Sequence, residues 1–324
     1  MDILKVDVEL LIQHGNKVFR PMIEEGITWS TERKGCPGEL QFKVVKDDVL
    51  TITEGDAVRL KVNGSKIFYG FIFKLKRDKE QIISVTAYDQ LRYLKNKDTY
   101  VYENKTAGEV IKMIAEDFHM QTGYIENTGF KIASRVEENT SLFDMIQNAL
   151  DLTLQNQSYM YVMYDDFGKI TLKGLDNMRL NILIDEETGE NFDYTSSIDD
   201  QTYNKVKLTY DNEKTGTREV YIAQDSQNIN SWGVLQHFDT LQEGENGQAK
   251  ADALLSLYNK KTRNLSIKNA FGDTRVRAGS MVVVMLDLGD VKVKNLMLVE
   301  KCKHEFNQNQ HFMNLTLRGG EFIA

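Results

Sequence analysis

The chain has 324 residues, of which 41% are hydrophobic and 27% charged, a balance typical of a globular protein with more than one hydrophobic core. Its 40 basic and 48 acidic residues leave a formal charge of −8, which argues against a surface built to neutralise nucleic-acid phosphates. The two cysteines are too few for a disulfide framework. The longest aliphatic run, MVVVML at 281–286, is too short for a membrane helix, which needs about 20 apolar residues.

Residues 1–98 are expected to form a small β-barrel. Short segments of alternating polar and apolar residues follow one another here, separated by turn residues, as in small sandwiches and barrels. The strongest hairpin signal is Asn63-Gly64, between DAVRLKV and KIFYGFIFKLKR. Another turn is predicted at Gly35-Cys36-Pro37-Gly38.

The stretch VTAYDQLRYLKNKD, residues 85–98, changes from a strand pattern to a helical one. Val85 and Ala87 alternate with a polar residue, whereas Leu91 and Leu94 lie three apart, as on one face of a helix. We expect this short helix to be buried together with Tyr88. The pattern suggests that it plugs the first barrel and sets the angle of the module that follows.

Residues 99–190 are expected to form an α+β module. Thr106 and Glu109 have the spacing of a capping box, and a second helix is predicted to begin near Thr140 or Ser141. YMYVMYDDFGKITLKG then predicts a hairpin that turns at residues 165–168. The apolar stripes of the two helices are Val110, Ile111, Ile114 and Phe118, followed by Leu142, Phe143, Ile146, Leu150 and Leu154.

Residues 191–324 are expected to form a second β-barrel. YNKVKLTYDNEKTGTREVYIAQD predicts a hairpin, and AKADALLSLYNK predicts a helical insertion near 245–260. The layout that starts at Gly55 (an alternating strand, a turn and an apolar strand) recurs from Gly279. The predicted fold class is therefore α+β, mostly β, with two similar small β-barrels flanking a module that contains helices.

His304 and His311, close to Cys302, are the strongest candidates for a metal site. They are seven residues apart on either side of a polar turn, whereas zinc sites use tighter pairs. We therefore interpret them as two histidines that face each other in a hairpin.

Adjacent acidic residues could serve as glycosidase carboxylates, but such pairs in polar turns are more often solvated. They occur at 165–166, 186–187 and 199–200. Nucleophile-elbow, P-loop and dinucleotide-binding motifs are absent from the sequence. The sequence therefore predicts no catalytic residue, no cofactor and no metal, and the chain is not expected to be an enzyme.

Six segments, taken in order, carry a resemblance that covers nearly the whole chain. They are ITWSTERKGCPGELQFKV, GDAVRLKVNGSKIFYGFIF, VTAYDQLRYLKNKDTYVY, YNKVKLTYDNE, SWGVLQHFDTLQEGENGQAKADALL and HEFNQNQHFMNLTL. Their order and spacing resemble a family of tail baseplate hub proteins from contractile-tailed phages, PBSX-like defective prophages and phage-tail-like bacteriocins. The chain is similar, more distantly, to late control protein D hubs and to spike-bearing hubs of contractile injection systems.

The resemblance implies a structural homotrimer. Two related barrels in each of three chains give six barrels in a ring, which can join a six-fold tail tube to a three-fold spike. The implied partners are the tail tube protein, the central spike protein and other baseplate proteins. The chain would be assembled in the bacterial host cytoplasm into a virion or a phage-tail-like particle. DNA could pass through its lumen without specific binding.

Two other functions fit the residues less well. One is a distal tail protein of a long non-contractile tail, and the other is a cell-wall hydrolase. A carbohydrate-binding module is weaker still, because the aromatic residues lie among aliphatic ones. The negative charge suggests either that acidic side chains line part of a channel, where they would repel DNA, or that they are dispersed on the outside for solubility.

Overall fold

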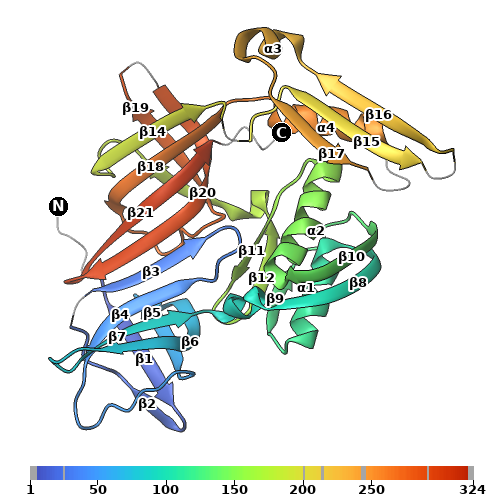
Figure 1. The fold of residues 1–324 in the computed structure, drawn as a ribbon. Helices are drawn as coiled ribbons and strands as arrows, with labels where there is room; N and C mark the ends of the chain where they lie inside the picture. Colours follow the sequence, from blue (N-terminus) through green and yellow to red (C-terminus); the bar gives the residue numbers. More distant parts are fainter. Residues whose placement is uncertain are drawn as a thin grey trace.

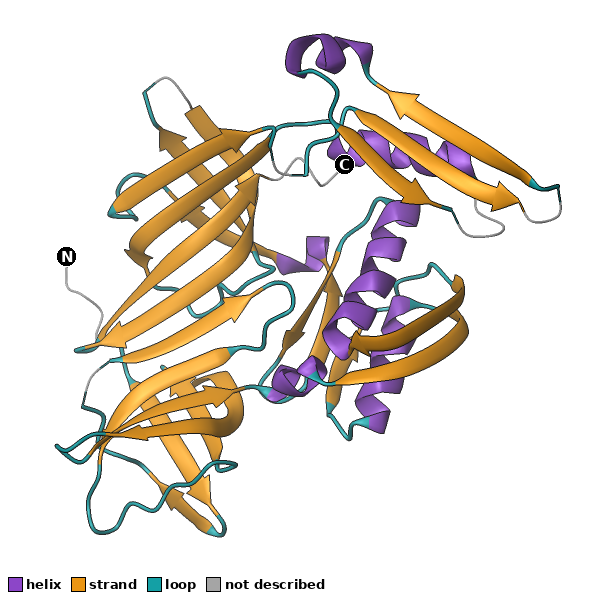
Figure 2. Cartoon of the chain, in the orientation of Figure 1, coloured by secondary structure: helices purple, strands orange, loops and turns teal. Residues whose placement is uncertain are grey.

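The computed structural model describes residues 6–24, 26–199, 201–212, 215–241, 246–289 and 292–319. Two curled β units lie next to each other, a helix-containing module packs beside them, and a smaller α/β unit lies above that module (Figure 1). Strands dominate, and the longer helices belong to the module and the smaller unit (Figure 2). The predicted fold class, α+β and mostly β, is confirmed.

The first β unit encloses its own hydrophobic core. Its strand order is β3-β4-β7-β6-β5-β1-β2. Asn63 and Gly64, with φ of 48° and 77°, both adopt the left-handed conformation that a two-residue hairpin requires, so the predicted hairpin is confirmed. Its strands are β1 (Val8–His14), β2 (Lys17–Phe19), β3 (Ile27–Glu32), β4 (Glu39–Val45), β5 (Ala57–Val62), β6 (Ser65–Arg77) and β7 (Ile82–Tyr88).

The helical module follows directly. The Thr106 side chain accepts a hydrogen bond from the Glu109 amide while the Glu109 carboxylate accepts one from the Thr106 amide, which confirms the capping box; Ser141 caps the second helix. Most of the predicted stripe positions are buried in one core. The elements are η1 (Gln90–Lys95), β8 (Lys97–Lys105), α1 (Ala107–Asp117), β9 (Thr122–Ile125), β10 (Ile132–Ser141), α2 (Leu142–Gln157), β11 (Tyr161–Asp165), β12 (Ile170–Gly174) and η2 (Leu175–Met178).

The short helix η1 is buried as expected, but it does not plug the first β unit. Leu91 and Leu94 pack into the core of the helical module, against α1 and α2. Tyr88 is half-buried and makes an edge contact with Phe73 of β6. The plug interpretation was therefore wrong: Leu91 and Leu94 both point toward the helices that follow, so η1 is the first element of the second module.

The second β unit is interrupted by the smaller unit. The predicted helix near 245–260 is α4, and it packs on a separate three-stranded sheet of order β16-β15-β17. The predicted hairpin at 203–225 belongs to that sheet. The second β unit comprises β13 (Arg179–Ile184), β14 (Asn191–Ser197), β18 (Thr262–Phe271), β19 (Met281–Asp287), β20 (Lys292–Asn307) and β21 (Gln310–Gly319). The inserted unit comprises β15 (Lys205–Asn212), β16 (Thr217–Gln224), α3 (Ser226–Trp232), β17 (Gln236–Thr240) and α4 (Gly247–Tyr258).

The two β units repeat one strand arrangement. The order β3-β4-β7-β6-β5 in the first matches β14-β18-β21-β20-β19 in the second. The sixth strands differ, because β1 runs antiparallel to β5 whereas β13 runs parallel to β19.

Backbone geometry at the two glycines supports the same equivalence. Gly55 and Gly279 both have φ of 91°, and their amides donate to the carbonyl oxygens of Ile72 and Val299. A β-bulge follows Ile72 in β6 and Val299 in β20. The repeat predicted from the glycine spacing is therefore present in the hydrogen bonding.

One continuous sheet joins the two β units. Residues 301–306 of β20 pair antiparallel with β3, the end strand of the first unit. Phe306 is buried in the core of the first unit, although it belongs to a strand of the second. Residues 301–306 of β20 therefore add a strand to the sheet of the first unit, and β20 takes part in both units.

Candidate functional site: the joint between the β units and its polar face

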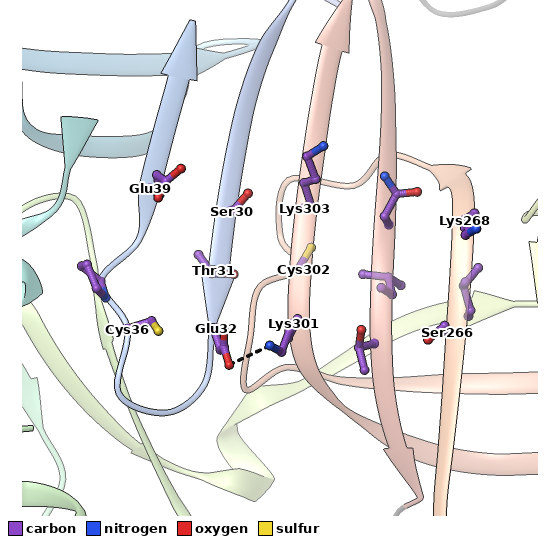
Figure 3. Close-up of a pocket in the computed structure, with 15 residues that line it drawn as sticks. Ser30, Thr31, Glu32, Cys36, Glu39, Ser266, Lys268, Lys301, Cys302 and Lys303 are labelled. Carbon is purple, nitrogen blue, oxygen red and sulfur yellow. Dashed lines mark ion pairs between the residues drawn. The ribbon is translucent and has the colours of Figure 1, made fainter. Parts of the chain in front are cut away.

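The outer face of the joint is polar from one β unit to the other. Residues of β3, β20, β21 and β18, together with Glu39 and the loop residues Cys36 and Pro37, line a depression of about 560 Å³ (Figure 3). Lys301 lies opposite Glu32 across the joint, with Nζ 2.9 Å from the carboxylate, and Lys303 lies opposite Ser30. The residues that alternate with these, such as Trp29 and His304, are buried on the other face.

The charge of this face is mixed. Lysines and carboxylates are interspersed with serine, threonine and amide side chains, and strand register places them on one side of the sheet. The charged members are Glu32, Glu39, Lys43, Lys74, Lys76, Asp193, Lys268, Lys301, Lys303, Glu305 and Arg318.

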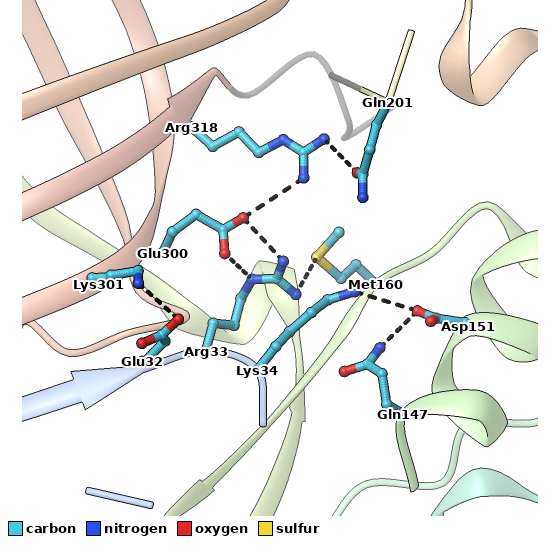
Figure 4. A network of polar contacts seen from close by, with 10 residues as sticks. All are labelled: Glu32, Arg33, Lys34, Gln147, Asp151, Met160, Gln201, Glu300, Lys301 and Arg318. Carbon is cyan, nitrogen blue, oxygen red and sulfur yellow. Dashed lines mark hydrogen bonds and ion pairs between the residues drawn. The ribbon is translucent and has the colours of Figure 1, made fainter. Parts of the chain in front are cut away.

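An ion pair at the edge of the joint connects the two β units. The Arg33 guanidinium donates to both oxygens of Glu300, from Nε at 2.8 Å and from Nη2 at 3.0 Å (Figure 4). Only 7% of the Arg33 side chain and 21% of the Glu300 side chain are exposed. Arg33 also contacts the sulfur of Met160. The bidentate geometry in a nearly buried place makes this pair stronger than a surface ion pair.

Lys34 extends the same network toward α2. Its Nζ lies 3.6 Å from the Asp151 carboxylate, which also accepts a hydrogen bond from Gln147 (Figure 4). Burial lowers the pKa of Lys34, and the nearby Asp151 opposes that shift. The loop between β3 and β4 therefore contacts the second β unit through Arg33 and the helical module through Lys34.

A second polar cluster lies where η1 begins. The buried carboxylate of Asp89 accepts hydrogen bonds from the amides of Gly38 and Leu91. Next to it, Gln90 donates to the Asp165 carboxylate, and Arg277 donates to the Asp165 carbonyl oxygen. Burial raises the pKa of Asp89 well above its usual range, with a further contribution from Asp165; burial also raises the pKa of Asp165. These residues come from all three parts of the chain.

The two histidines of β20 and β21 face each other, as predicted. His304 Nδ1 lies 2.8 Å from His311 Nε2, and His304 Nε2 lies 2.8 Å from the Val276 carbonyl oxygen. Because that carbonyl can only accept, Nε2 of His304 carries the proton and Nδ1 accepts from His311. Burial lowers the pKa of His304 to about 3 and that of His311 to about 4. Both rings are therefore neutral members of the core around Trp29, against which His304 stacks.

The geometry brings together no catalytic or metal-binding set in the described part of the chain. No group of three histidine, cysteine or carboxylate side chains there could hold a metal ion. Among the acidic pairs, Glu186, Glu187 and Asp199 are exposed, and Asp200 lies outside the described residues. The surface interpretation was wrong for Asp165, which is buried because it anchors the cluster with Gln90.

A search of the described helices found none that is both long and apolar enough to cross a membrane.

A model of the YqbQ-like family matches residues 27–318. The chain belongs to this family. It is 32% identical over 306 residues to protein YqbQ of Bacillus subtilis (strain 168), with 91% of each chain covered. It is 31% identical over 307 residues to the phage-like element PBSX protein XkdQ of the same organism, covering 91% of this chain and 92% of XkdQ. The resemblance to PBSX-like proteins is thereby confirmed.

Solved structures share the fold of this YqbQ-like chain at low sequence identity. The 43 kDa tail protein of prophage MuSo2 from Shewanella oneidensis superposes with a TM-score of 0.72 and 11% identity, covering 98% of this chain and all of that one. The E. coli c3393 protein, a type VI secretion system component described as similar to bacteriophage T4 tail proteins gp27 and gp5, gives a TM-score of 0.58 and 9% identity. That match covers 99% of this chain and 78% of c3393.

Proposed function

We propose that this chain is a structural subunit of a phage tail or phage-tail-like particle, in which it acts as the baseplate hub. Three copies would form a ring that joins a six-fold tail tube to a three-fold central spike. The kinship with the PBSX protein XkdQ and the fold shared with prophage tail proteins support a tail component. The hub role rests on the internal repeat.

The repeat is the observation that carries the proposal. A three-fold object meets six equivalent edges of a tube only if each chain presents the same shape twice. The matching strand order, the two glycines at φ of 91° and the paired β-bulges supply that shape. The β3–β20 joint also sets the two copies side by side in one sheet, as neighbouring members of a ring must be.

The polar face of the sheet is the surface we assign to the channel. It is continuous across both β units and free of large exposed aliphatic side chains around the joint. Its lysines and carboxylates are interspersed, so the wall would be mixed in charge and not predominantly acidic. Such a wall gives a passing DNA strand neither a continuous basic track to bind nor a strongly repelling one.

The role proposed here is structural and involves no catalysis. The buried carboxylates and histidines bond to backbone groups or to neighbouring side chains inside the protein, as Asp89 does to the amide of Gly38 and Glu137 to Arg135. The depression at the joint is lined by the Glu32–Lys301 ion pair together with hydroxyl, amide and aliphatic side chains. The partners would be the tail tube protein, the spike protein and other baseplate proteins, with assembly in the host cytoplasm.

Mass measurement tests the proposal. The purified chain is expected to form a trimer, alone or when expressed with the adjacent tail tube and spike proteins, when measured by light scattering coupled to size exclusion. A stable dimer, or a monomer in the presence of both partners, would contradict it. Clearing of a cell-wall suspension by the pure protein would favour a wall hydrolase instead. A purified particle with a long non-contractile tail would favour a distal tail protein.

A further inference from the structure

The repeat implies a second contact equivalent to the β3–β20 joint, and a single chain does not form it. After the bulge at Glu300, β20 departs from β19, and residues 301–306 pair with β3. The repeat makes β20 equivalent to β6, and β3 equivalent to β14. The joint within the chain is therefore a contact between one copy of the long bent strand and the end strand of the other repeat.

Both strands needed for the reverse contact have a free edge. β6 pairs with β5 only as far as Phe71 and then continues to Arg77 with β7 on one side. No strand in the described part of the chain pairs with the other side of residues 74–77. β14 is the end strand of the long sheet, with β18 on one side and no described strand on the other. Free edges of this kind template the addition of a further strand.

We propose that β6 of one chain pairs antiparallel with β14 of a second copy, so that the contact between chains repeats the joint within each chain. The inference rests on the proposed ring, and it names the surfaces that close it. Three such contacts alternate with three β3–β20 joints around the axis. Every β unit then has a neighbouring β unit on both sides, and the free edges of β6 and β14 are covered.

The repeat also gives the register. Lys301 and Lys74 occupy the same place, because each follows its bulge and lies opposite a threonine, Thr316 or Thr86. Within the chain Lys301 faces Glu32 and Lys303 faces Ser30. Tracing β14 through β18 and β21 in the same way sets Ser197 in the place of Glu32 and Thr195 in the place of Ser30. Between chains, Lys74 therefore faces Ser197 and Lys76 faces Thr195.

The side chains along this register are compatible up to the end of β6 at Arg77. One pair further on, Asp78 would lie opposite Asp193, so the pairing ends with β6. Lys76 lies diagonally across from Asp193, an attractive arrangement on a sheet surface. Where Glu300 meets Arg33 inside the chain, the equivalent residues are Phe73 and Ile198, both half-buried. An ion pair in one joint is thus replaced by an apolar pair in the other, and neither joint leaves a charge without its counterpart at this point.

Disulfide trapping tests the pairing. Lys76→Cys and Thr195→Cys are combined in a Cys36→Ser background, because Cys36 is partly exposed whereas Cys302 is buried. Residues directly opposite in antiparallel strands bring their Cβ atoms within roughly 4.5–5.5 Å, close to disulfide range. The full-length variant is expressed with the tail tube and spike proteins, oxidised with copper phenanthroline and analysed on a denaturing gel. Covalent trimers are expected.

Matched variants make the result decisive. Lys74→Cys with Ser197→Cys, the second predicted pair, should cross-link as well, and it covers the case in which the first pair impairs folding. Lys43→Cys with Thr195→Cys should not, because β4 lies two strands away from β6 in the sheet. A trimer by light scattering that neither predicted pair cross-links would overturn the strand pairing and leave the hub role intact. A monomer or dimer in the presence of both partners would overturn the hub role together with the pairing.

Discussion

Arg33 and Glu300 lie 267 positions apart in the sequence, yet the guanidinium of one donates two hydrogen bonds to the carboxylate of the other. Arg33 follows β3, and Glu300 is the bulged residue of β20, so the pair marks the point where the two repeats meet. The Arg33 amide also donates to the Glu300 carbonyl oxygen, at 3.0 Å. Side chains and backbone therefore define the same joint.

Breaking this pair should be costly. Arg33→Ala removes both guanidinium hydrogen bonds to the Glu300 carboxylate and leaves it only the more distant Arg318, at 3.8 Å, as a cationic neighbour. We expect the free energy of unfolding to fall by about 2–3 kcal/mol. Urea titration followed by circular dichroism measures the change. Glu32→Ala is the matched control, since it removes the exposed ion pair with Lys301 in the same joint and should cost about 1 kcal/mol or less. Equal losses for the two variants would contradict the argument.

Leu94 should be essential to the helical module. Its side chain is fully buried against α1 and α2, so Leu94→Ala removes contacts and leaves a cavity, at a cost of about 2–5 kcal/mol. Thermal and denaturant unfolding report the loss. Val101→Ala, at a position 64% exposed on β8, is expected to change stability little. A change near zero for Leu94→Ala would mean that η1 is not part of the module's core.

The two facing histidines predict acid destabilisation. In the unfolded chain both imidazoles bind a proton near pH 6.5, whereas in the folded protein His304 resists until about pH 3 and His311 until about pH 4. The unfolded state therefore binds more protons between these values, and stability present above pH 6.5 is lost as the pH falls. The slope is at most about 1.4 kcal/mol per pH unit for each imidazole, and less for the partly exposed His311.

A pair of variants isolates this contribution. His311→Gln should flatten the dependence of unfolding free energy on pH between about pH 4 and 6.5. His119→Gln, at an exposed position at the end of α1, should leave it as it is. Identical slopes for His311→Gln and the unmodified protein would show that the pair does not resist protonation.

The buried carboxyl of Asp89 predicts the opposite trend at higher pH. Its pKa is raised above the unfolded value, so the stability it contributes is present at acid pH and is lost as the pH rises through its folded pKa. Asp89→Asn should remove that decline. It should also lower stability by about 1–3 kcal/mol, because one carboxamide oxygen cannot serve the amides of both Gly38 and Leu91.

The measurement is a set of urea titrations from about pH 4, near the unfolded pKa of an aspartate, upward through neutrality, with the exposed Glu116→Gln on α1 as the control. Loss of the decline with rising pH in Asp89→Asn alone is the expected outcome. A decline that persists in that variant would assign it to other groups.

Local signals predicted the local structure well. The capping box at Thr106 and the turn at Asn63-Gly64 depend on residues a few positions apart, and both are present. The sequence also predicts that the layout starting at Gly55 recurs from Gly279, because a left-handed backbone position favours glycine in both copies. These features need only the chemistry of neighbouring residues.

Long-range pairing could not be predicted in the same way. Nothing in ITWSTE or KCKHEF states that β3 and β20 pair, since alternation indicates a buried face but not the partner strand. The sequence predicts a solvated Asp165, because the residues that enclose it, Gln90 and Arg277, are remote in sequence. The hairpin of β15 and β16 gave no sign that it would form a separate sheet with β17.

The shared strand β20 also determines when the protein can finish folding during synthesis. The last residue of β3, Glu32, is made about 270 positions before its pairing partner at residues 301–306. At roughly 5–20 residues per second, the first unit, complete at Tyr88, waits roughly 10–45 s for Phe306 and for its last neighbouring strand. The helical module and the inserted unit can acquire their cores in the meantime. The edge of β3 therefore stays open to strand-edge aggregation until residues 301–306 have emerged.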